Sequence, residues 1–121
     1  MSPTVSLKGI KENPTLLASS LTRGTDEGKP VKISANKTAA LSSDDQVFCG
    51  IIESIELDNS VCVVRNHGMA ILPYTGTAPT IGYGKLSANG TGGVRISSGT
   101  VPYYFIYDVD TTNELVTFDL G

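Results

Sequence analysis

Short runs that alternate apolar and polar residues follow one another along this chain, separated by turn-forming residues at intervals of about ten, a spacing typical of all-β folds. "VKISA" (31–35) and "ELVTFDL" (114–120) both show the period of two that a half-buried strand requires. In the second run, Val116, Phe118 and Leu120 are predicted to face the core. The predicted strands span residues 15–21, 31–35, 39–41, 46–58, 60–66, 67–73, 83–86, 94–97, 103–109 and 114–120.

The sequence contains no convincing helical period, and its thirteen glycines and six prolines stand mainly between the runs. This punctuation predicts an all-β fold, either a compact β-sandwich or a small β-barrel of roughly eight to ten short strands. Residues 15–121 are expected to form a single β domain. Residues 1–14 have no sustained period and end in Asn13-Pro14, so they are interpreted as an extended N-terminal arm.

The longest apolar stretch, residues 46–58, contains Gly50, which indicates a bulge or a close approach of two backbones. From Ile51 to Leu57 this stretch alternates regularly. Asp58-Asn59 is a predicted turn, and residues 60–66 are expected to pair back on the stretch as a hairpin. The last strand is expected to dock against residues 103–109.

Charge narrows the classes of partner. Only 17% of the residues are charged, against an average of about 25%, and the net charge is −3. The basic residues are scattered, so phosphate-based nucleic-acid binding and an electrostatic membrane patch are both disfavoured. The sequence also shows neither the apolar core of a signal peptide nor a membrane-spanning stretch, and we expect synthesis in a cytoplasm.

The two cysteines, Cys49 and Cys62, both stand in apolar runs. Free cysteine is among the most buried residue types, so both are predicted to be reduced core residues. A disulfide between adjacent strands is the alternative.

Candidate chemistry is sparse. His67, the only histidine, has no nucleophile signature around it and is expected to bond the local backbone before Gly68. Asp108, Asp110 and Asn113 could offer oxygens to calcium, but they lack EF-hand spacing and are interpreted as a solvated turn. The glycines at 82–84 and 89–93 are predicted to make turns with positive φ, not a phosphate loop. We therefore predict no enzyme activity, no cofactor and no metal.

The densest aromatic run is "YYFIY" (103–107). Alternation sends Tyr103, Phe105 and Tyr107 to one face of a strand and Tyr104 and Ile106 to the other. A stacking platform for bases or sugars is disfavoured because the chain has no tryptophan and no basic residues flank the run. One face is expected to be core and the other a surface between subunits.

Several segments together resemble the small decoration, or cement, proteins of tailed bacteriophage capsids. They are "GKPVKI", "TAAL", the pattern D-D-x-V-F-x-G-I-I, a hairpin ending in "HGMAILPYTGTAPTIGYGKL", and a glycine-rich turn before "GGV". The resemblance covers about residues 27–96 and leaves the N-terminal segment and the last two strands unmatched.

The resemblance implies a structural protein that binds the outer surface of a phage head, contacts the major capsid protein and stabilises the shell, often as a homotrimer at threefold positions. It would be made in the bacterial host cytoplasm and reside on the virion. The loop "YTGTAPTIGYG" and the arm are then expected to contact neighbouring subunits or the shell. The expected contact residues are Val5, Leu7, Ile10, Tyr74, Thr77, Pro79, Ile81 and Tyr83.

Two other classes stay open. One is a carbohydrate-binding or adhesion module displayed on a virion. The other is a tail or head-completion subunit, whose ring would have sixfold or twelvefold symmetry.

Overall fold

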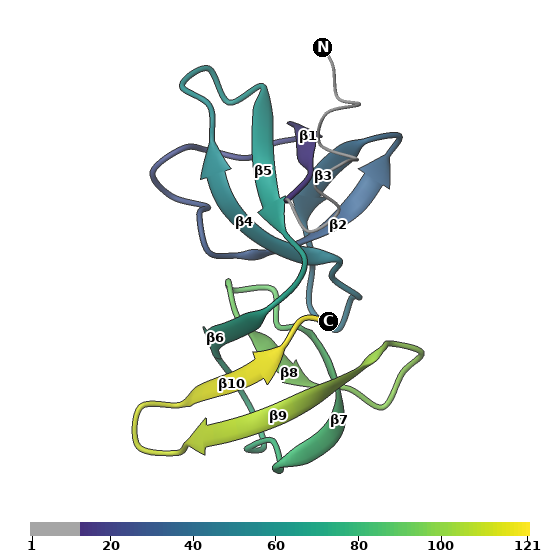
Figure 1. Ribbon diagram of the computed structural model, residues 1–121, viewed down its shortest axis with the longest axis vertical. Helices are drawn as coiled ribbons and strands as arrows, with labels where there is room; N and C mark the ends of the chain where they lie inside the picture. Colours follow the sequence, from purple (N-terminus) through teal and green to yellow (C-terminus); the bar gives the residue numbers. More distant parts are fainter. Residues whose placement is uncertain (1–12) are drawn as a thin grey trace.

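The computed structural model describes residues 13–121, which form ten strands and no helix, so the predicted all-β fold is confirmed. The strands are arranged as two bodies, a closed five-stranded barrel and a five-stranded sheet (Figure 1). The barrel contains β1 (Thr15–Ala18), β2 (Pro30–Ala35), β3 (Thr38–Leu41), β4 (Gly50–Ile55) and β5 (Val61–Arg65). The sheet contains β6 (Met69–Pro73), β7 (Gly82–Ala88), β8 (Val94–Ile96), β9 (Tyr103–Asp110) and β10 (Leu115–Asp119).

The barrel follows the order β1-β3-β2-β4-β5 and closes where β1 pairs antiparallel with β5. Its interior is filled by side chains, as expected for so few strands. The predicted hairpin is confirmed, because β4 and β5 pair antiparallel across the turn at 56–60. The buried residues of this core are Leu21, Val31, Ala39, Ile52, Ile55, Cys62 and Val64.

Gly50 lies where β4 crosses β5 at very short range. A Cβ added at Gly50 would stand 2.6 Å from the carbonyl oxygen of Arg65 and 2.6 Å from Cγ1 of Val64, which confirms the close approach predicted from the sequence. The predicted alternation from Ile51 to Leu57 is wrong. A bulge places Ile52 opposite Val64 and Ser54 opposite Val63, so the extra residue turns the pattern out of phase and the strand ends at Ile55.

The second sheet follows the order β6-β10-β9-β7-β8, and it curls until a parallel bridge between Tyr74 and Val94 links its two edges. The predicted docking of the last strand is confirmed, since β10 pairs with β9 along its whole length. Val116 and Phe118 are fully buried and Leu120 packs against the same core. This core comprises Phe48, Ile51, Ala70, Leu72, Tyr74, Leu86, Ala88, Val94, Tyr104, Ile106, Val116 and Phe118.

The connection between β3 and β4 joins the two bodies. Phe48 belongs to this connection, yet its ring is stacked on Tyr104 of the second sheet at 5.1 Å. The Asp45 amide donates to the Ala88 carbonyl, 2.7 Å away, and one Asp45 carboxylate oxygen accepts the hydroxyls of Ser87 and Ser97, both at 2.8 Å. The barrel is therefore fastened to the sheet by a stacked ring and a carboxylate.

Strand β6 forms one edge of the second sheet, with β10 as its only neighbour in the strand order. At its start the Arg65 guanidinium donates to the Met69 carbonyl oxygen, 2.6 Å away. At its end stands Pro73, which has no N–H to offer. Between them, Ile71 is an exposed side chain of this edge strand.

Both cysteines are free. Cys62 is buried in the barrel, as predicted. Cys49 is exposed, so its prediction as a core residue is wrong. The cause is local: Phe48, its larger neighbour, turns into the core and Cys49 turns away from it.

Candidate interaction surface

Three aromatic rings meet on the outer face of the second sheet. Tyr83 on β7 packs edge-on against Phe105 on β9 at 4.8 Å, and Phe105 contacts Tyr107 at 4.8 Å. Tyr83 is 75% exposed and Tyr107 is 52% exposed. Tyr104 and Ile106 point to the buried side, so the alternation predicted for this strand is confirmed.

The rings continue across the sheet as a row of side chains. Tyr83 is in register with Phe105, Phe105 with Asp119, and Asp119 with Met69, so the row crosses four strands. Neighbouring strands lie about 4.8 Å apart, which gives the row a length of about 14 Å. Ile71, 64% exposed, lies two residues along β6. We call Tyr83, Tyr103, Phe105, Tyr107, Met69 and Ile71 the aromatic face.

Charge on the aromatic face is unevenly placed. On the β7 side, the Lys85 ammonium lies 5.5 Å from the centre of the Tyr103 ring and donates to the Gly99 carbonyl. On the β10 side, Asp119 stands within the row between Met69 and Phe105, and Asp108 is in register with Thr117. The face thus combines exposed rings with carboxylates along one flank.

Of the described residues that were expected to make contacts, some are exposed and others are buried. Thr77, Ile81 and Tyr83 are exposed, and Tyr83 belongs to the aromatic face. Pro79 is buried, and it lines a shallow hollow of about 170 Å³ together with Tyr83. Val5, Leu7 and Ile10 lie outside the described residues.

Tyr74 is a correction to the predicted contact set. It is 5% exposed and belongs to the core of the second sheet. Alternation after the exposed Pro73 turns Tyr74 inward, and its amide donates to the Glu114 carbonyl at 3.0 Å. Its ring is therefore a packing element and is not available to a partner.

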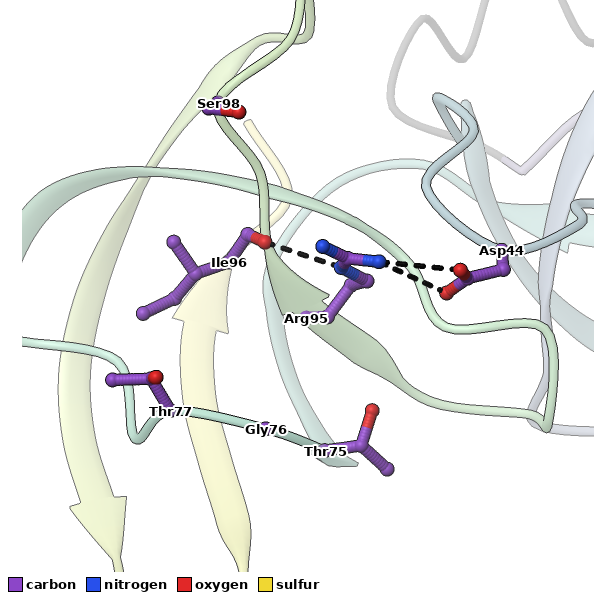
Figure 2. A pocket seen from close by; sticks show the side chains of 7 residues that line it. All are labelled: Asp44, Thr75, Gly76, Thr77, Arg95, Ile96 and Ser98. Atoms are coloured by element: carbon purple, nitrogen blue, oxygen red, sulfur yellow. Dashed lines mark hydrogen bonds and ion pairs between the residues drawn. The ribbon is translucent and has the colours of Figure 1, made fainter.

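A polar groove of about 600 Å³ opens where the two bodies meet (Figure 2). The Arg95 guanidinium lies 3.2 Å and 3.4 Å from the two carboxylate oxygens of Asp44 and donates to the Ile96 carbonyl. The opposite wall is the loop after β6, with Thr75 and Thr77. This groove presents a charge pair and hydroxyls, which are polar groups suited to a polar ligand.

The barrel carries an apolar depression of its own. Lys32, Ile33, Gln46, Val47 and Cys49 line a space of about 380 Å³, which we call the barrel hollow. Ile33 and Val47 are exposed, and the Lys32 ammonium is hydrogen-bonded to the neutral Gln46 side chain at 2.9 Å. Cys49 is exposed as a residue, but partial desolvation of its thiol raises the pKa of that group.

The remaining candidates of the sequence occupy turns. The ring of His67 lies 3.2 Å from the Asn66 side-chain oxygen. Asp110 accepts the amides of Thr112 and Asn113, and hydrogen bonds from Asn113 lower the pKa of this carboxyl, as in a tight solvated turn. Within residues 13–121, no group of three or more His, Cys, Asp or Glu side chains could hold a metal ion.

The predicted glycine turns are confirmed at Gly90 and Gly92, which both have positive φ, and the prediction is wrong for Gly93, whose φ is not positive. At 82–84 the prediction holds only for Gly82, because Gly84 continues within β7 and its φ is not positive.

Sequence reasoning missed Met69 and Ile71. The signal was present, since "HGMAILP" alternates in the same way as the other strands. That pattern does not reveal, however, that β6 and β9 lie on the same sheet, with only β10 between them.

Neither a known protein-family model nor a curated protein matches this sequence. Among the described residues there is no helix of the length and apolarity needed to cross a membrane.

Proposed function

We propose that the protein is a capsid decoration protein that binds the outer surface of a phage head, contacts the major capsid protein and acts as a trimer on the virion. The aromatic face is the observation that carries this proposal. Tyrosine and methionine are enriched where proteins meet, and a contiguous exposed apolar patch marks an interaction site. The resemblance of residues 27–96 to decoration proteins supplies the identity of the partner.

The construction of the face supports a clamping role. Its rings stand on paired strands with a filled core beneath them, so little conformational entropy is lost when they are covered. A clamp on a shell needs only modest affinity for each contact, because several linked contacts multiply.

The test is occupancy of shells assembled without this protein. We expect the double variant Tyr83→Ala/Tyr107→Ala to keep its thermal unfolding midpoint within a few degrees and to lose at least tenfold in shell affinity. Leu57→Ala, which truncates an 81% exposed side chain in the β4–β5 turn, is the matched control and should bind like the parent protein. Cryo-electron microscopy of virions should place the density on the outer face. Full occupancy by the double variant would contradict the role of the face, and absence of the protein from virions would contradict the function.

The arm is tested separately by removing residues 2–12. Asn13 and Pro14 are retained because they bond the barrel, through the Glu53 carboxylate and the Val64 amide respectively. Loss of occupancy with unchanged thermal stability is expected if the arm holds the shell.

The polar groove favours a second candidate, a carbohydrate-binding module. The paired Asp44 and Arg95 and the hydroxyls of Thr75 and Thr77 could hydrogen-bond a saccharide. A glycan array would decide: binding that Arg95→Ala abolishes supports this candidate, while an array without signal leaves decoration as the function.

A further inference from the structure

We propose that the barrel hollow of one copy of this chain receives the aromatic face of the next copy, so that self-association is head-to-tail. The inference deepens the proposed function: the aromatic face then acts on shell binding indirectly, because it joins the copies whose linked shell contacts multiply. It rests on the proposed function only for this link and for the number of copies in the ring.

The two surfaces are both open within a single chain. Tyr83 and Tyr107 on the face and Ile33 and Val47 in the hollow are all exposed. The face and the hollow therefore do not cover each other within one copy, and no other part of residues 13–121 covers either apolar surface.

Their charges are complementary. Among residues 13–121, Lys32 is the one charged side chain that lines the hollow, and its hydrogen-bond partner there, Gln46, is neutral. The face carries Asp119 within its row of side chains, and the partner that the structure gives this carboxylate is the Gly121 amide. Docking the face on the hollow would bring Lys32 near Asp119 while the rings cover Ile33 and Val47.

The two surfaces lie on different bodies of the chain. The hollow is a space of about 380 Å³ on the barrel, and the face carries its exposed rings on the second sheet. A contact between two different patches is heterologous, and it closes into a ring when the rotation between copies permits. Two faces meeting each other would bring Lys85 of one copy near the carboxylate flank of the other, so the experiment must separate this arrangement from docking on the hollow.

Cys49 makes this contact measurable, because a native thiol already lines the hollow. Thr117 lies beside the aromatic face, in register with Ile71, and is not one of its members. We expect Thr117→Cys, cross-linked with a short bismaleimide in purified protein, to give covalent dimers and larger rings. The cross-link should vanish when Cys49→Ser is added. Cys62 is buried and should not react in the folded protein. Leu57→Cys, on the β4–β5 turn, is the control and should give no product that depends on Cys49.

Three outcomes would overturn the inference. A cross-link that survives Cys49→Ser would mean that two faces meet each other. A protein that stays monomeric by light scattering at all accessible concentrations would mean that no such contact forms. A protein that self-associates without any Cys49-dependent product would mean that another surface is used.

Mixing two defective variants gives an independent readout. Val47→Asp disables the hollow and Tyr107→Ala the face, so each variant alone should be monomeric. Mixed together, they retain one intact face and one intact hollow and should form dimers that cannot close into rings. A mixture that stays monomeric, while each variant melts like the parent protein, would contradict a head-to-tail contact. Shell occupancy is measured in a separate experiment. Absence of cross-linking together with intact shell binding would contradict the head-to-tail contact and would not contradict the proposed function.

Discussion

At Gly93 the loop before β8 passes so close to the end of β6 that no side chain fits. A Cβ at this position would overlap the Pro73 carbonyl oxygen and stand 2.9 Å from the side-chain amide nitrogen of Asn89. Asn89 accepts the Gly93 amide, so the neighbours cannot withdraw without breaking that bond. The requirement here is space and not a left-handed backbone, since the φ of Gly93 is not positive.

We expect Gly93→Ala to lower the free energy of unfolding by about 1–3 kcal/mol, the usual cost of overfilling a packed site. Urea titration followed by tyrosine fluorescence measures it. Gly99→Ala is the matched control, because its Cβ would meet only the Ser97 hydroxyl at 3.5 Å and its φ is likewise not positive. The control should change stability by less than about 0.5 kcal/mol. Equal effects for the two substitutions would contradict the steric explanation.

Individual residues also mark where sequence reasoning succeeds. Alternation within "YYFIY" correctly placed Tyr104 and Tyr107 on opposite faces, because a strand imposes a period of two, and the structure shows that the Tyr104 face is the core. It failed for Tyr74, which stands in a segment interpreted as a loop. The bridge between Tyr74 and Val94 that turns this residue inward joins positions twenty residues apart, and local patterning carries no information on such contacts.

Among elements, the connection between β3 and β4 contains a carboxyl group, that of Asp45, whose pKa is lowered in the fold. Hydrogen bonds from the Ser97 and Ser87 hydroxyls lower the pKa of the Asp45 carboxyl. A carboxyl whose pKa is lower in the folded state stabilises the fold above its unfolded pKa of about 3.9 and loses that contribution as the pH falls through the folded pKa.

We therefore expect Asp45→Asn to lower the melting temperature near pH 7 and to leave the variant and the parent protein nearly equal at strongly acid pH. Asparagine suits the position because Asp45 has a φ of 61°, a left-handed conformation that asparagine tolerates. Thermal melts across the acid range measure the difference. Asp44→Asn is the control: its ion pair with Arg95 is exposed and contributes about 0–1 kcal/mol. A difference between Asp45→Asn and the parent protein that grows toward acid pH would contradict the assignment.

The strands were predicted well as elements, but which of their side chains face the core was predicted less well. Every predicted strand has a counterpart, because turn residues and β-branched runs mark strands locally. In β4 the predicted alternation ends at the bulge between Ile52 and Ser54, because one inserted residue moves every following side chain to the opposite face of the sheet. Gly50 indicated one irregularity in this stretch. The structure has two, the close approach at Gly50 and the bulge between Ile52 and Ser54.

For the whole molecule, the central question is how two cores behave as one cooperative unit. The barrel and the sheet have separate apolar clusters, and Phe48 reaches from the connection into the cluster of the sheet. The five tyrosines, at 74, 83, 103, 104 and 107, all lie in the second body. Tyrosine fluorescence thus reports on the sheet, while the reactivity of the buried Cys62 thiol reports on the barrel.

We expect the two probes to give coincident urea transitions in the parent protein. Phe48→Ala should lower the free energy of sheet unfolding by about 3–5 kcal/mol and separate the two transitions, because a fully buried ring between two aromatic neighbours is removed. Val64→Ala, in the barrel core, is the counterpart and should shift the Cys62 transition first. Coincident transitions in Phe48→Ala would mean that the hydrogen bonds of Asp45 and the packing of Ile51 from β4 into the sheet core couple the bodies without the ring.

The partly blocked edge of β6 affects how the protein behaves at high concentration. An open strand edge is a template on which identical chains can stack into fibrils, and a protein crowded on a surface meets its own copies constantly. Arg65 occupies the Met69 carbonyl at one end of β6, and Pro73 has no N–H to donate at the other. A continuous ladder of hydrogen bonds to a foreign strand is therefore interrupted at both ends of this edge, which disfavours the stacking of identical chains along β6.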